Sequence, residues 1–586
     1  MKLIYDKKYE VIDGNMTEFQ VGSRKNKNIR NNSWLMNNIV LEAVRKKKNC
    51  DLLVLDYKEC FDSLHLESIT NSLYESGVQD DHLNLIHEAN SSHLIKVNTP
   101  FGQTEVQEIK KKILQGETFG PLACSNSVDK ISKICVEDKR NLYLYRSDSE
   151  DPVEIAPLGM VDDIIAVSEC GVDSVKMCSY LNTQTNIMKL QFGASKCHKL
   201  HVGNDKTLCP DLFLDNWKLE PKTTVMTSVW DREDTEDNAA VVEEVSEDSY
   251  LGELVSSNSK IDKNIEKRVS RGISAGNAII EILNETVFGN YDFEVFVVLR
   301  NSLLLSTLIS NGESWNNIMT KHIQDLEQTD ERIMCKKFEL HPKTSRTFLY
   351  LETGTMPVRY LLMRRRLMYL QYLLQQGPES VLFKCLKAMM KSTLRGDWLE
   401  LVTKDLKDLD IKLSYEEIEK FSKEDLKELV KEQTEIKAFG HLMGIKEKQT
   451  KMRDLEYKKL EPAEYLKPES NLRRSEVNSI LTLRSSMLDI PENFKSSSDP
   501  NRDKCLLCKD QNLTQEHLLV CKELNANSIS NTEKSLEYKD LFTNKTEKIK
   551  EITEIIFRNF NKYKLLIQSG PTTDRDSRCR TTGPGS

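Results

Sequence analysis

An adjacent pair of acids inside an apolar segment restricts the fold of this chain more than any other feature. In GMVDDIIAVS, Asp162 and Asp163 are flanked by apolar residues on both sides, a pattern typical of two strands that meet at a tight turn. A third acid, Asp56, directly follows the apolar run LLVL. Acids that leave a buried sheet together repel one another, and burial without a partner destabilises them. The sequence therefore predicts a sheet edge where cations neutralise these carboxylates.

Divalent ions suit such a group of acids. Carboxylate oxygens are hard ligands for Mg²⁺, which keeps part of its coordination shell for water and phosphates. Two such ions about 4 Å apart support in-line phosphoryl or nucleotidyl transfer. Asp56 taken alone also fits an ordinary turn or helix-capping residue, whereas the pair Asp162 and Asp163 favours a metal site.

The net charge of −8 is confined to one segment of the chain. Residues 231–248 hold nine acids against one Arg, which accounts for the whole imbalance. Residues 20–49 carry eight basic residues against one acid, and residues 343–396 carry ten against two. Two basic tracts on a neutral background fit a channel for a polyanion, with an acidic surface loop elsewhere. On charge alone, solvated helix faces explain the tracts equally well.

The apolar pattern divides the 586 residues into two kinds of region. Short apolar runs at 51–57, 141–147 and 158–168 alternate with segments of helix length, which predicts a mixed region of helices and strands. From about residue 258 to 483, segments rich in Leu, Lys, Glu, Arg and Met predict helices. Capping signals place helix starts at Ser414 and Ser422.

We expect a protein of the nucleus and cytoplasm with no membrane partner. No run reaches the roughly 20 apolar residues of a membrane helix, and the first residues lack the apolar core of a signal peptide. Most of the 14 Cys are scattered, which in a reducing compartment predicts free thiols rather than a disulfide framework.

Six motifs in one order resemble the reverse transcriptase of non-LTR (LINE-type) retrotransposons. They are FQVGSRKNKNIRNN (19–32), LLVLDYKECFDSL (52–64), ILQGETFGPL (113–122), LGMVDDIIAVS (158–168), LQFGASKCHKLHVG (190–203) and YLGEL (250–254). The resemblance covers about residues 15 to 565 and implies an α+β right-hand polymerase. Its implied parts are partial, truncated fingers (1–50), a palm (51–255, with the acidic loop 231–249), a helical thumb (256–340), a basic all-α region (341–490), a zinc knuckle with its linker (491–530) and a C-terminal helix with a disordered tail (531–586).

The resemblance assigns roles residue by residue. Asp56, Asp162 and Asp163 resemble the three carboxylates that bind two Mg²⁺ ions, and the main-chain carbonyl of Tyr57 would be a further ligand. Phe61 resembles the aromatic gate that excludes a ribose 2′-OH, so dNTPs would be preferred. Lys196 resembles the lysine that protonates the leaving pyrophosphate. Gln115 and Gly116 resemble residues that line the nucleotide site. The primer grip is resembled by Tyr250, Leu251 and Gly252.

Two departures from the family bear on activity. In the family, a fingers segment with triphosphate-binding basic residues precedes the FQVG motif, and the eighteen residues before Phe19 do not match it. No endonuclease pattern is visible either. We therefore expect a fragment or a decayed copy of a longer element-encoded protein, without target cleavage on this chain.

One group of Cys and His near the C-terminus has the spacing of a zinc site. Cys505, Cys508, His517 and Cys521 follow a Cys-x2-Cys-x8-His-x3-Cys pattern, and four such ligands close a tetrahedron around one Zn²⁺. The alternative is a helix with incidental thiols. The family carries a similar knuckle, usually with four residues in the last gap, and its work would be to grip RNA or DNA or simply to hold the fold.

Arg24 and Lys25 in the first basic tract, and Arg364, Arg365 and Arg366 in the second, are the predicted nucleic-acid contacts. On a helix, some of the three consecutive arginines share one face and could bind phosphates. The alternative is an amphipathic helix with ordinary solvated Arg.

Two functions fit these observations. The first is an RNA-directed DNA polymerase that uses Mg²⁺, an RNA template, a DNA primer or target and dNTPs. The second is a catalytically inactive, truncated remnant of such a polymerase that binds nucleic acid. The intact acids and gate position favour the enzyme, and the unmatched fingers favour the remnant.

Overall fold

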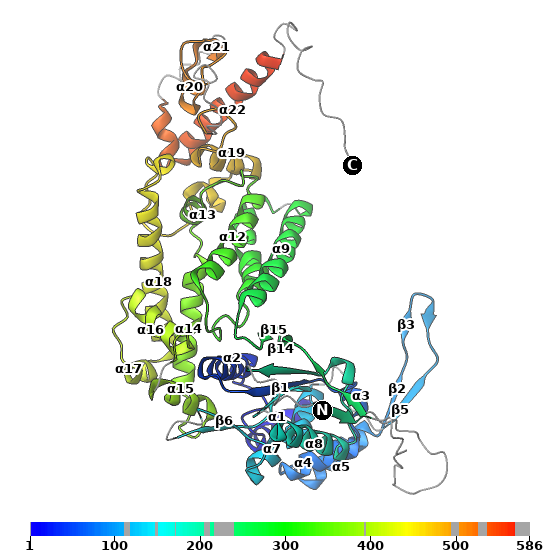
Figure 1. The fold of residues 1–586 in the computed structure, drawn as a ribbon. Coiled ribbons are helices and arrows are strands. Elements are labelled where there is room, and N and C mark those ends of the chain that lie inside the picture. The colour runs from blue at the N-terminus through cyan, green and yellow to red at the C-terminus, as the bar shows by residue number, and fades with distance from the viewer. Residues whose placement is uncertain are drawn as a thin grey trace, which may run out of the picture. The chain divides into compact units, whose positions relative to one another are not determined.

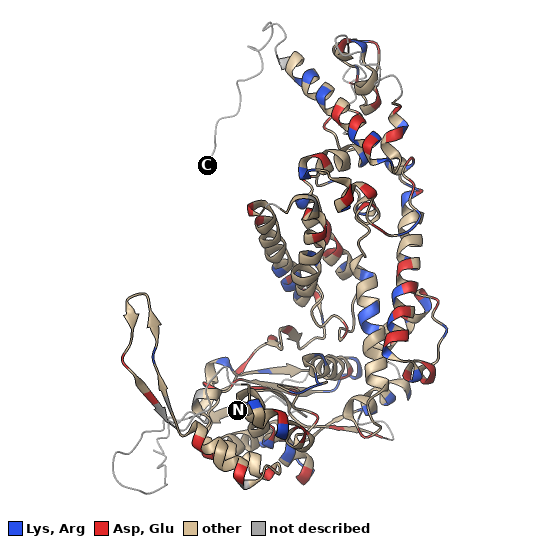
Figure 2. Cartoon of the chain, turned by 180° about the vertical axis from the view of Figure 1, so that it is seen from behind, with Lys and Arg blue, Asp and Glu red and all other residues tan. Residues whose placement is uncertain are grey.

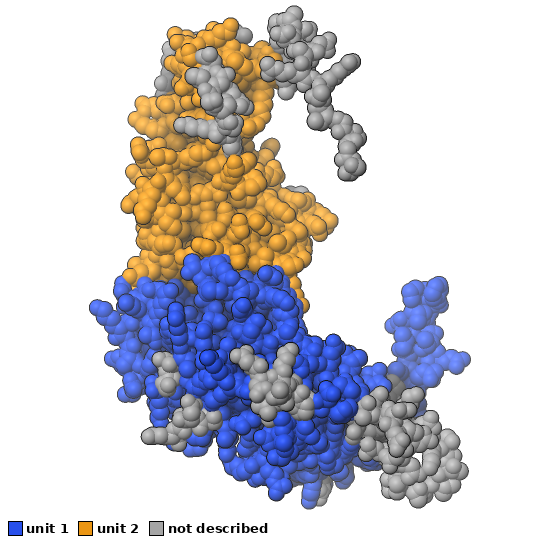
Figure 3. All heavy atoms as spheres, viewed as in Figure 1, with its two compact units in different colours: residues 1–267, 311–322, 362–430 blue, residues 268–310, 323–361, 431–586 orange. Residues whose placement is uncertain are grey.

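The computed structural model describes residues 2–110, 118–146, 151–169, 171–203, 211–215, 239–286, 288–391, 394–493, 503–525 and 536–568. The chain divides into two compact units, which Figure 3 colours separately. Unit 1 comprises residues 1–267, 311–322 and 362–430, and unit 2 comprises residues 268–310, 323–361 and 431–586. No helix in these ranges has both the length and the apolar character that crossing a bilayer requires.

The main sheet of unit 1 has β1 (Cys50–Leu55) at its centre. Its strand order is β13-β10-β1-β9-β8, with β8 at Leu158–Met160, β9 at Asp163–Glu169, β10 at His198–Val202 and β13 at Glu243–Glu244. Strand β1 pairs antiparallel with both β9 and β10. All six residues of β1 are buried, as expected for a central strand that is covered on both faces. This confirms the predicted strand in residues 51–57.

Helices pack on this sheet and close the core of unit 1 (Figure 1). The core includes Leu55 of β1, Ile164 of β9 and Leu122 of α6. The segment after Leu66 forms two helices, because the chain turns at Gly77 with a φ of +86°. The helices of this part are α1 (Lys2–Asn15), α2 (Ile29–Lys46), α3 (Cys60–Ser63), α4 (Leu66–Glu75), α5 (Asp80–Asn90), α6 (Gly120–Val128), α7 (Lys130–Asp138) and α8 (Val172–Ile187).

Several two-stranded antiparallel sheets flank the main sheet. β2 (Ser92–Ile95) pairs with β5 (Gln107–Lys110), and β3 (Asn98–Thr99) pairs with β4 (Gly102–Gln103) between them; these strands extend away from the main sheet in Figure 1. The others pair β6 (Tyr143–Tyr145) with β7 (Val153–Ile155), β11 (Phe213–Asp215) with β12 (Ala239–Val241), and β14 (Glu247–Tyr250) with β15 (Glu253–Ser256).

Strands occupy most of the described part of the predicted acidic loop. Residues 231–238 lie outside the described residues, and most of the following stretch forms β12, β13 and β14. Glu243 and Glu244 of β13 pair in parallel with His198 and Lys199 of β10. The Nζ of Lys199 lies 3.5 Å from a carboxylate oxygen of Glu244, so a neighbouring cation offsets the charge that favoured a loop.

Unit 1 also contains α15 (Val381–Lys391), α16 (Trp398–Asp408) and α17 (Tyr415–Lys420), and α14 (Val358–Leu374) ends in it. The predicted capping box is confirmed: Ser414 Oγ accepts from Glu417 N, and Glu417 accepts from Ser414 N. Ser422 likewise caps α18 (Lys423–Lys446) by accepting from Asp425 N.

Unit 2 is helical, as the composition after residue 258 predicts. The α-helices and the π-helical turn that lie wholly or partly in it are α9 (Asp262–Glu285), α10 (Asp292–Leu299), the π-helical turn (Arg300–Leu305), α11 (Ser306–Leu308), α12 (Thr320–Lys337), α13 (Arg346–Thr353), the start of α14, α18, α19 (Arg474–Arg484), α20 (Gln515–Val520), α21 (Lys522–Asn525) and α22 (Thr546–Gln568). A Cβ at Gly276 of α9 would lie 2.3 Å from Ile333 of α12, so glycine lets these two helices pack closely. Acidic and basic residues are interspersed along these helices (Figure 2).

Candidate active site

The turn between β8 and β9 carries the predicted acid pair. Met160 pairs with Asp163, so Val161 and Asp162 form a two-residue turn. Val161 has a φ of +59°, which is a rare conformation for a β-branched residue. A positive φ at the first central residue alone is the pattern of a type II′ hairpin turn. The tight turn predicted for GMVDDIIAVS is therefore confirmed, with backbone strain at its first residue.

The sheet brings Asp56 beside this turn. Leu55 of β1 pairs with Ile164 of β9, so the next residues outward are Asp56 and Asp163. Desolvation by the surrounding protein, followed by repulsion from Asp162 and Asp56, raises the pKa of Asp163 to about 6, although its side chain is exposed. Desolvation and the charge of Asp56 also raise the pKa of Asp162. Asp56 thus lies close enough to oppose the ionisation of Asp162 and Asp163.

Lys196 joins the same group. It ends a short 3-10 helix, Ala194–Lys196, and its Nζ lies 3.2 Å from Asp56 Oδ2. The preceding loop is fixed on the end of β1, because Gly193 N donates to Asp56 O and the rings of Tyr57 and Phe192 stack with centroids 4.7 Å apart. An exposed cation is therefore held beside the acids.

The positions predicted for nucleotide binding are only partly described. The ring of Tyr57 is buried in the core, and its main chain leads from Asp56 into α3. Phe61 lies on α3, half-buried, and packs against the same core. Gln115 and Gly116 lie outside the described residues.

The predicted primer-grip residues form a hairpin turn. Leu251 and Gly252 both have positive φ, +49° and +77°, as a type I′ turn between β14 and β15 requires. Tyr250 is buried, and its hydroxyl donates to the main-chain oxygen of Leu158 at 3.1 Å. This bond ties the hairpin to β8, which leads into the acid pair.

The carboxylates stand further apart than the ligands of a closed metal site. Among the described residues, one group of three or more His, Cys, Asp and Glu has its ligand atoms within 4.8 Å of one another, and that group is the C-terminal cysteine cluster. Repulsion between the three aspartates favours separation, and gathering them takes a cation. The residues are of the type that suits Mg²⁺, while the spacing of a bound pair of ions is a prediction.

A basic pocket of about 630 Å³ opens beside Met160. Arg24, Lys25 and Lys27 line it, together with Thr118. Lys27 was not singled out from the sequence, although it lies in the first basic tract. Desolvation, with repulsion from Arg24, lowers the pKa of Lys27. The pocket therefore gathers positive charge next to the strand that leads to Asp162.

Two predicted nucleic-acid contacts are used inside the protein instead. The side chain of Arg24 is 5% exposed, pairs with Asp13 at 2.6 Å and donates to the main-chain oxygens of Asp13 and Gln20. Arg366 is buried and binds Asp405 through two hydrogen bonds of 2.6 and 3.0 Å. A buried charge without a partner is strongly destabilising, so these carboxylate and carbonyl partners are needed by the fold. Neither guanidinium is therefore available to a phosphate. For Lys25, Arg364 and Arg365, nucleic-acid contact stays a prediction.

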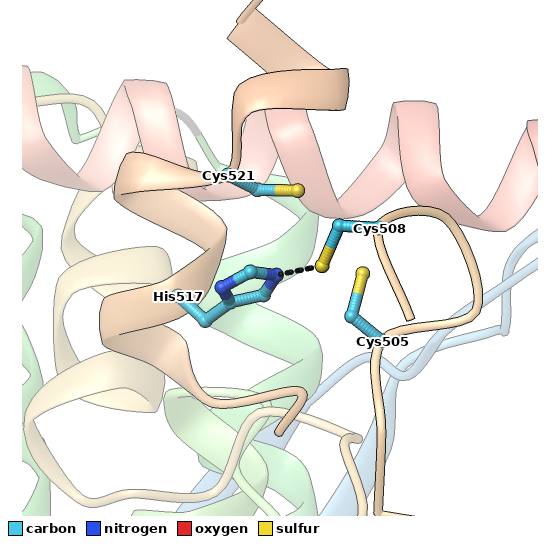
Figure 4. A group of neighbouring side chains, drawn as sticks. All are labelled: Cys505, Cys508, His517 and Cys521. Atoms are coloured by element: carbon cyan, nitrogen blue, oxygen red, sulfur yellow. Dashed lines mark hydrogen bonds between the residues drawn. The ribbon is translucent and has the colours of Figure 1, made fainter. Parts of the chain in front are cut away.

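The four predicted zinc ligands converge in unit 2 (Figure 4). Cys505 and Cys508 lie on one loop, His517 lies on α20, and Cys521 directly follows α20. His517 Nε2 lies 3.4 Å from Cys508 Sγ. Desolvation raises the pKa of Cys505 to about 11, and main-chain N–H groups of Gln511 and Asp510 lower the pKa of Cys508. The cluster has the composition and the closeness of a tetrahedral zinc site.

A neighbouring amide and a long helix support this cluster. His517 Nδ1 lies 2.8 Å from Gln511 Oε1, which leaves Nε2 directed at the sulfur atoms. Asn559 of α22 donates to Leu518 O, and Lys562 donates to Leu524 O. The spacing of Cys and His predicted the four ligands. No sequence signal predicted the contact of Gln511 with His517.

Known proteins give little further guidance. Neither a protein-family model nor a curated protein matches the sequence. Among solved structures, the chain is similar to telomerase from Candida albicans in a complex with a fragment of telomeric RNA (TM-score 0.31, 11% identity, 57% of this chain covered). It is also similar to apo telomerase from Candida tropicalis (TM-score 0.32, 10% identity, 73% of this chain covered). The matches span 54% and 60% of those telomerase chains, and such low scores carry no argument about the site.

Proposed function

We propose that the chain is an RNA-directed DNA polymerase of the non-LTR retrotransposon type, which copies element RNA into DNA. The observation that carries the proposal is the meeting of Asp56, Asp162, Asp163 and Lys196 at one sheet edge. These residues come from three of the six motifs that resemble the family. Strain at Val161 in the same turn is typical of functional sites, and it supports a role beyond folding.

The acids would hold two Mg²⁺ ions, and the raised pKa values of Asp162 and Asp163 fit a site built for cations. When bound, the ions would stabilise the charge of the transferring phosphoryl group. Lys196 is placed to donate a proton to the departing pyrophosphate, because its ammonium already lies beside Asp56. Phe61, five residues after Asp56, would exclude the 2′-OH of a ribonucleotide.

The pocket beside Met160 supports a polyanionic partner. Lys25 is exposed, and Lys25 and Lys27 line the pocket next to β8. This strand leads into the turn of residues 160–163, which we call the acid turn. Phosphate groups of an RNA template or of a dNTP would meet positive charge there. The hairpin of Tyr250 to Gly252 would hold the primer end, since Tyr250 is bonded to β8.

The second candidate is a catalytically inactive nucleic-acid-binding remnant. The segment before Phe19 favours it, since it does not match the triphosphate-binding fingers segment of the family. In that case the basic pocket and the zinc cluster would bind RNA or DNA without chemistry.

A primer-extension assay separates the two candidates. The purified chain is given a DNA primer on an RNA template, four dNTPs and Mg²⁺, and the products are sized and sequenced. The polymerase proposal expects template-directed extension that a metal chelator abolishes. Binding of primer and template without extension over a range of Mg²⁺ and Mn²⁺ concentrations would favour the remnant.

A further inference from the structure

The buried side-chain amide of Gln20 is hydrogen-bonded to Val161, the strained residue of the acid turn. Gln20 is 1% exposed, and its Oε1 accepts from the main-chain N–H of Val161 at 2.9 Å. Its Nε2 donates to the main-chain oxygen of the same residue at 3.1 Å. One side chain therefore satisfies both main-chain polar groups of Val161. Gly22 N also donates to Oε1 at 2.9 Å, and these two donors fix which end of the amide is oxygen.

Two glycines make room for this arrangement. A Cβ at Gly159 would lie 2.8 Å from Gln20 Nε2, and a Cβ at Gly22 would lie 2.3 Å from Val161 N. The segments also pair through main-chain bonds from Val21 N to Gly159 O and from Gly159 N to Phe19 O, both of 3.0 Å. Asn32 Nδ2 donates to Gly159 O at 3.0 Å. The backbone around the turn is thus built to admit the amide of Gln20.

We infer that Gln20 is a positioning residue for the acid turn: it holds Val161 in its left-handed conformation and so fixes Asp162 and Asp163 relative to Asp56. A β-branched residue at a φ of +59° is strained, and such strain persists only where the surroundings impose it. Two hydrogen bonds from a buried, rigidly packed amide impose it. As a statement about catalysis, this inference rests on the proposed polymerase function.

The decisive test is a double-mutant cycle between Gln20 and Val161. Gln20→Leu removes both bonds with little change of volume, and we expect it to slow primer extension by about tenfold to a hundredfold, the effect of a small misplacement of reacting groups. Val161→Gly removes the strain, because glycine adopts positive φ freely. We expect Val161→Gly to restore most of the lost rate in the Gln20→Leu background, so that the effect of Gln20→Leu is much smaller there than in the parental chain.

Gln371→Leu is the matched control. Gln371 is a buried glutamine of unit 1 whose amide donates to the main-chain oxygens of Ile418 and Phe421. If its loss slows extension at all, Val161→Gly should not repair the defect. A Gln20→Leu defect that Val161→Gly leaves unrepaired, or no defect at all, would overturn the inference.

A second measurement is independent of activity. Amide hydrogen exchange of the peptide over residues 158–166 should be faster in Gln20→Leu, because the N–H of Val161 loses its acceptor, and unchanged in Gln371→Leu. If the parent chain extends no primer, the proposed function fails, and this exchange experiment alone decides on Gln20. Unchanged exchange in Gln20→Leu would then refute the positioning role.

Discussion

The carboxylates at the acid turn carry like charges and repel one another. The folding stability of the protein should therefore depend on pH. The folded state raises the pKa of Asp163 from an ordinary 3.8 to about 6 through desolvation and then through Asp162 and Asp56. Between these values the folded chain binds a proton more tightly than the unfolded chain does. Folding stability should therefore fall as pH rises from about 4 to about 6, and stay lower above that range.

Removal of this charge should stabilise the protein in metal-free buffer. Because the side chain is exposed, we expect Asp163→Asn to raise the free energy of unfolding by no more than about 1 kcal/mol at pH 7.5, with no difference below about pH 4. Thermal unfolding midpoints across pH measure this, with Asn at the exposed Asp211 as control. A destabilised Asp163→Asn variant at pH 7.5 would contradict the assignment of repulsion.

Much of the acid site could be predicted from sequence, because the information is local. The apolar flanks of Asp162 and Asp163 predict both the strands and the turn, and the pairing of Leu55 with Ile164 brings in Asp56. Gln20 could not be found this way. Its contact with Val161 spans 141 residues, and a lone Gln in a polar segment gives no local sign of burial.

At the scale of single elements, α14 shows how charge alone misleads. The run Arg364 to Arg366 predicts a basic face, but helix geometry turns consecutive residues to different sides. Arg366 faces inward and binds Asp405 of α16. A guanidinium nitrogen of Arg365 lies 3.7 Å from Glu313 Oε2. A tertiary partner 39 residues away decides the role of Arg366, and sequence spacing does not reveal it.

Arg366→Met should therefore act on stability and not on phosphate binding. It leaves the buried Asp405 unpaired, and we expect a loss of about 3–5 kcal/mol in the free energy of unfolding. The double variant Arg366→Met, Asp405→Leu should regain much of it. Denaturant unfolding measures both, and a flatter salt dependence of RNA binding in the folded Arg366→Met protein would instead restore the phosphate role.

The zinc cluster is the element in which sequence and structure agree most closely, since its ligands lie within 17 residues and their spacing is characteristic. Cys505→Ser should abolish stoichiometric zinc and unfold residues 503–523 locally, because so short a segment has little core of its own. Metal analysis and hydrogen exchange measure this, with Cys335→Ser on α12 as the control. Full zinc occupancy in Cys505→Ser would contradict the assignment of this cluster as the zinc site.

On the scale of the whole molecule, each basic tract of the sequence includes residues that serve the fold. The basic tract 20–49 places Lys25 and Lys27 on the pocket, while Arg24 serves the fold. The tract 343–396 includes Arg366, which is also internal. Composition therefore predicted the presence of basic groups, but tertiary structure decides which of them face a ligand.

Nucleic-acid binding should consequently depend on the pocket lysines. Each phosphate contact releases a counterion, so Lys25→Gln with Lys27→Gln should flatten the slope of log affinity against log salt by up to about two. Binding to RNA at several salt concentrations measures the slope. Lys176→Gln, which changes an exposed lysine of α8 outside both tracts, should leave it unchanged. An unaltered slope in the pocket variant would place the contacts elsewhere.

The most direct test of the central claim compares Asp162→Asn with the parent chain in primer extension on an RNA template with Mg²⁺. Asn keeps the size of the side chain and removes the charge, and repulsion in the turn decreases, so the fold should survive. We predict template-directed DNA synthesis by the parent and a reduction of at least about 10²–10³-fold in Asp162→Asn, with primer and template still bound. Equal synthesis by both proteins would contradict the claim that these carboxylates are the site of nucleotidyl transfer.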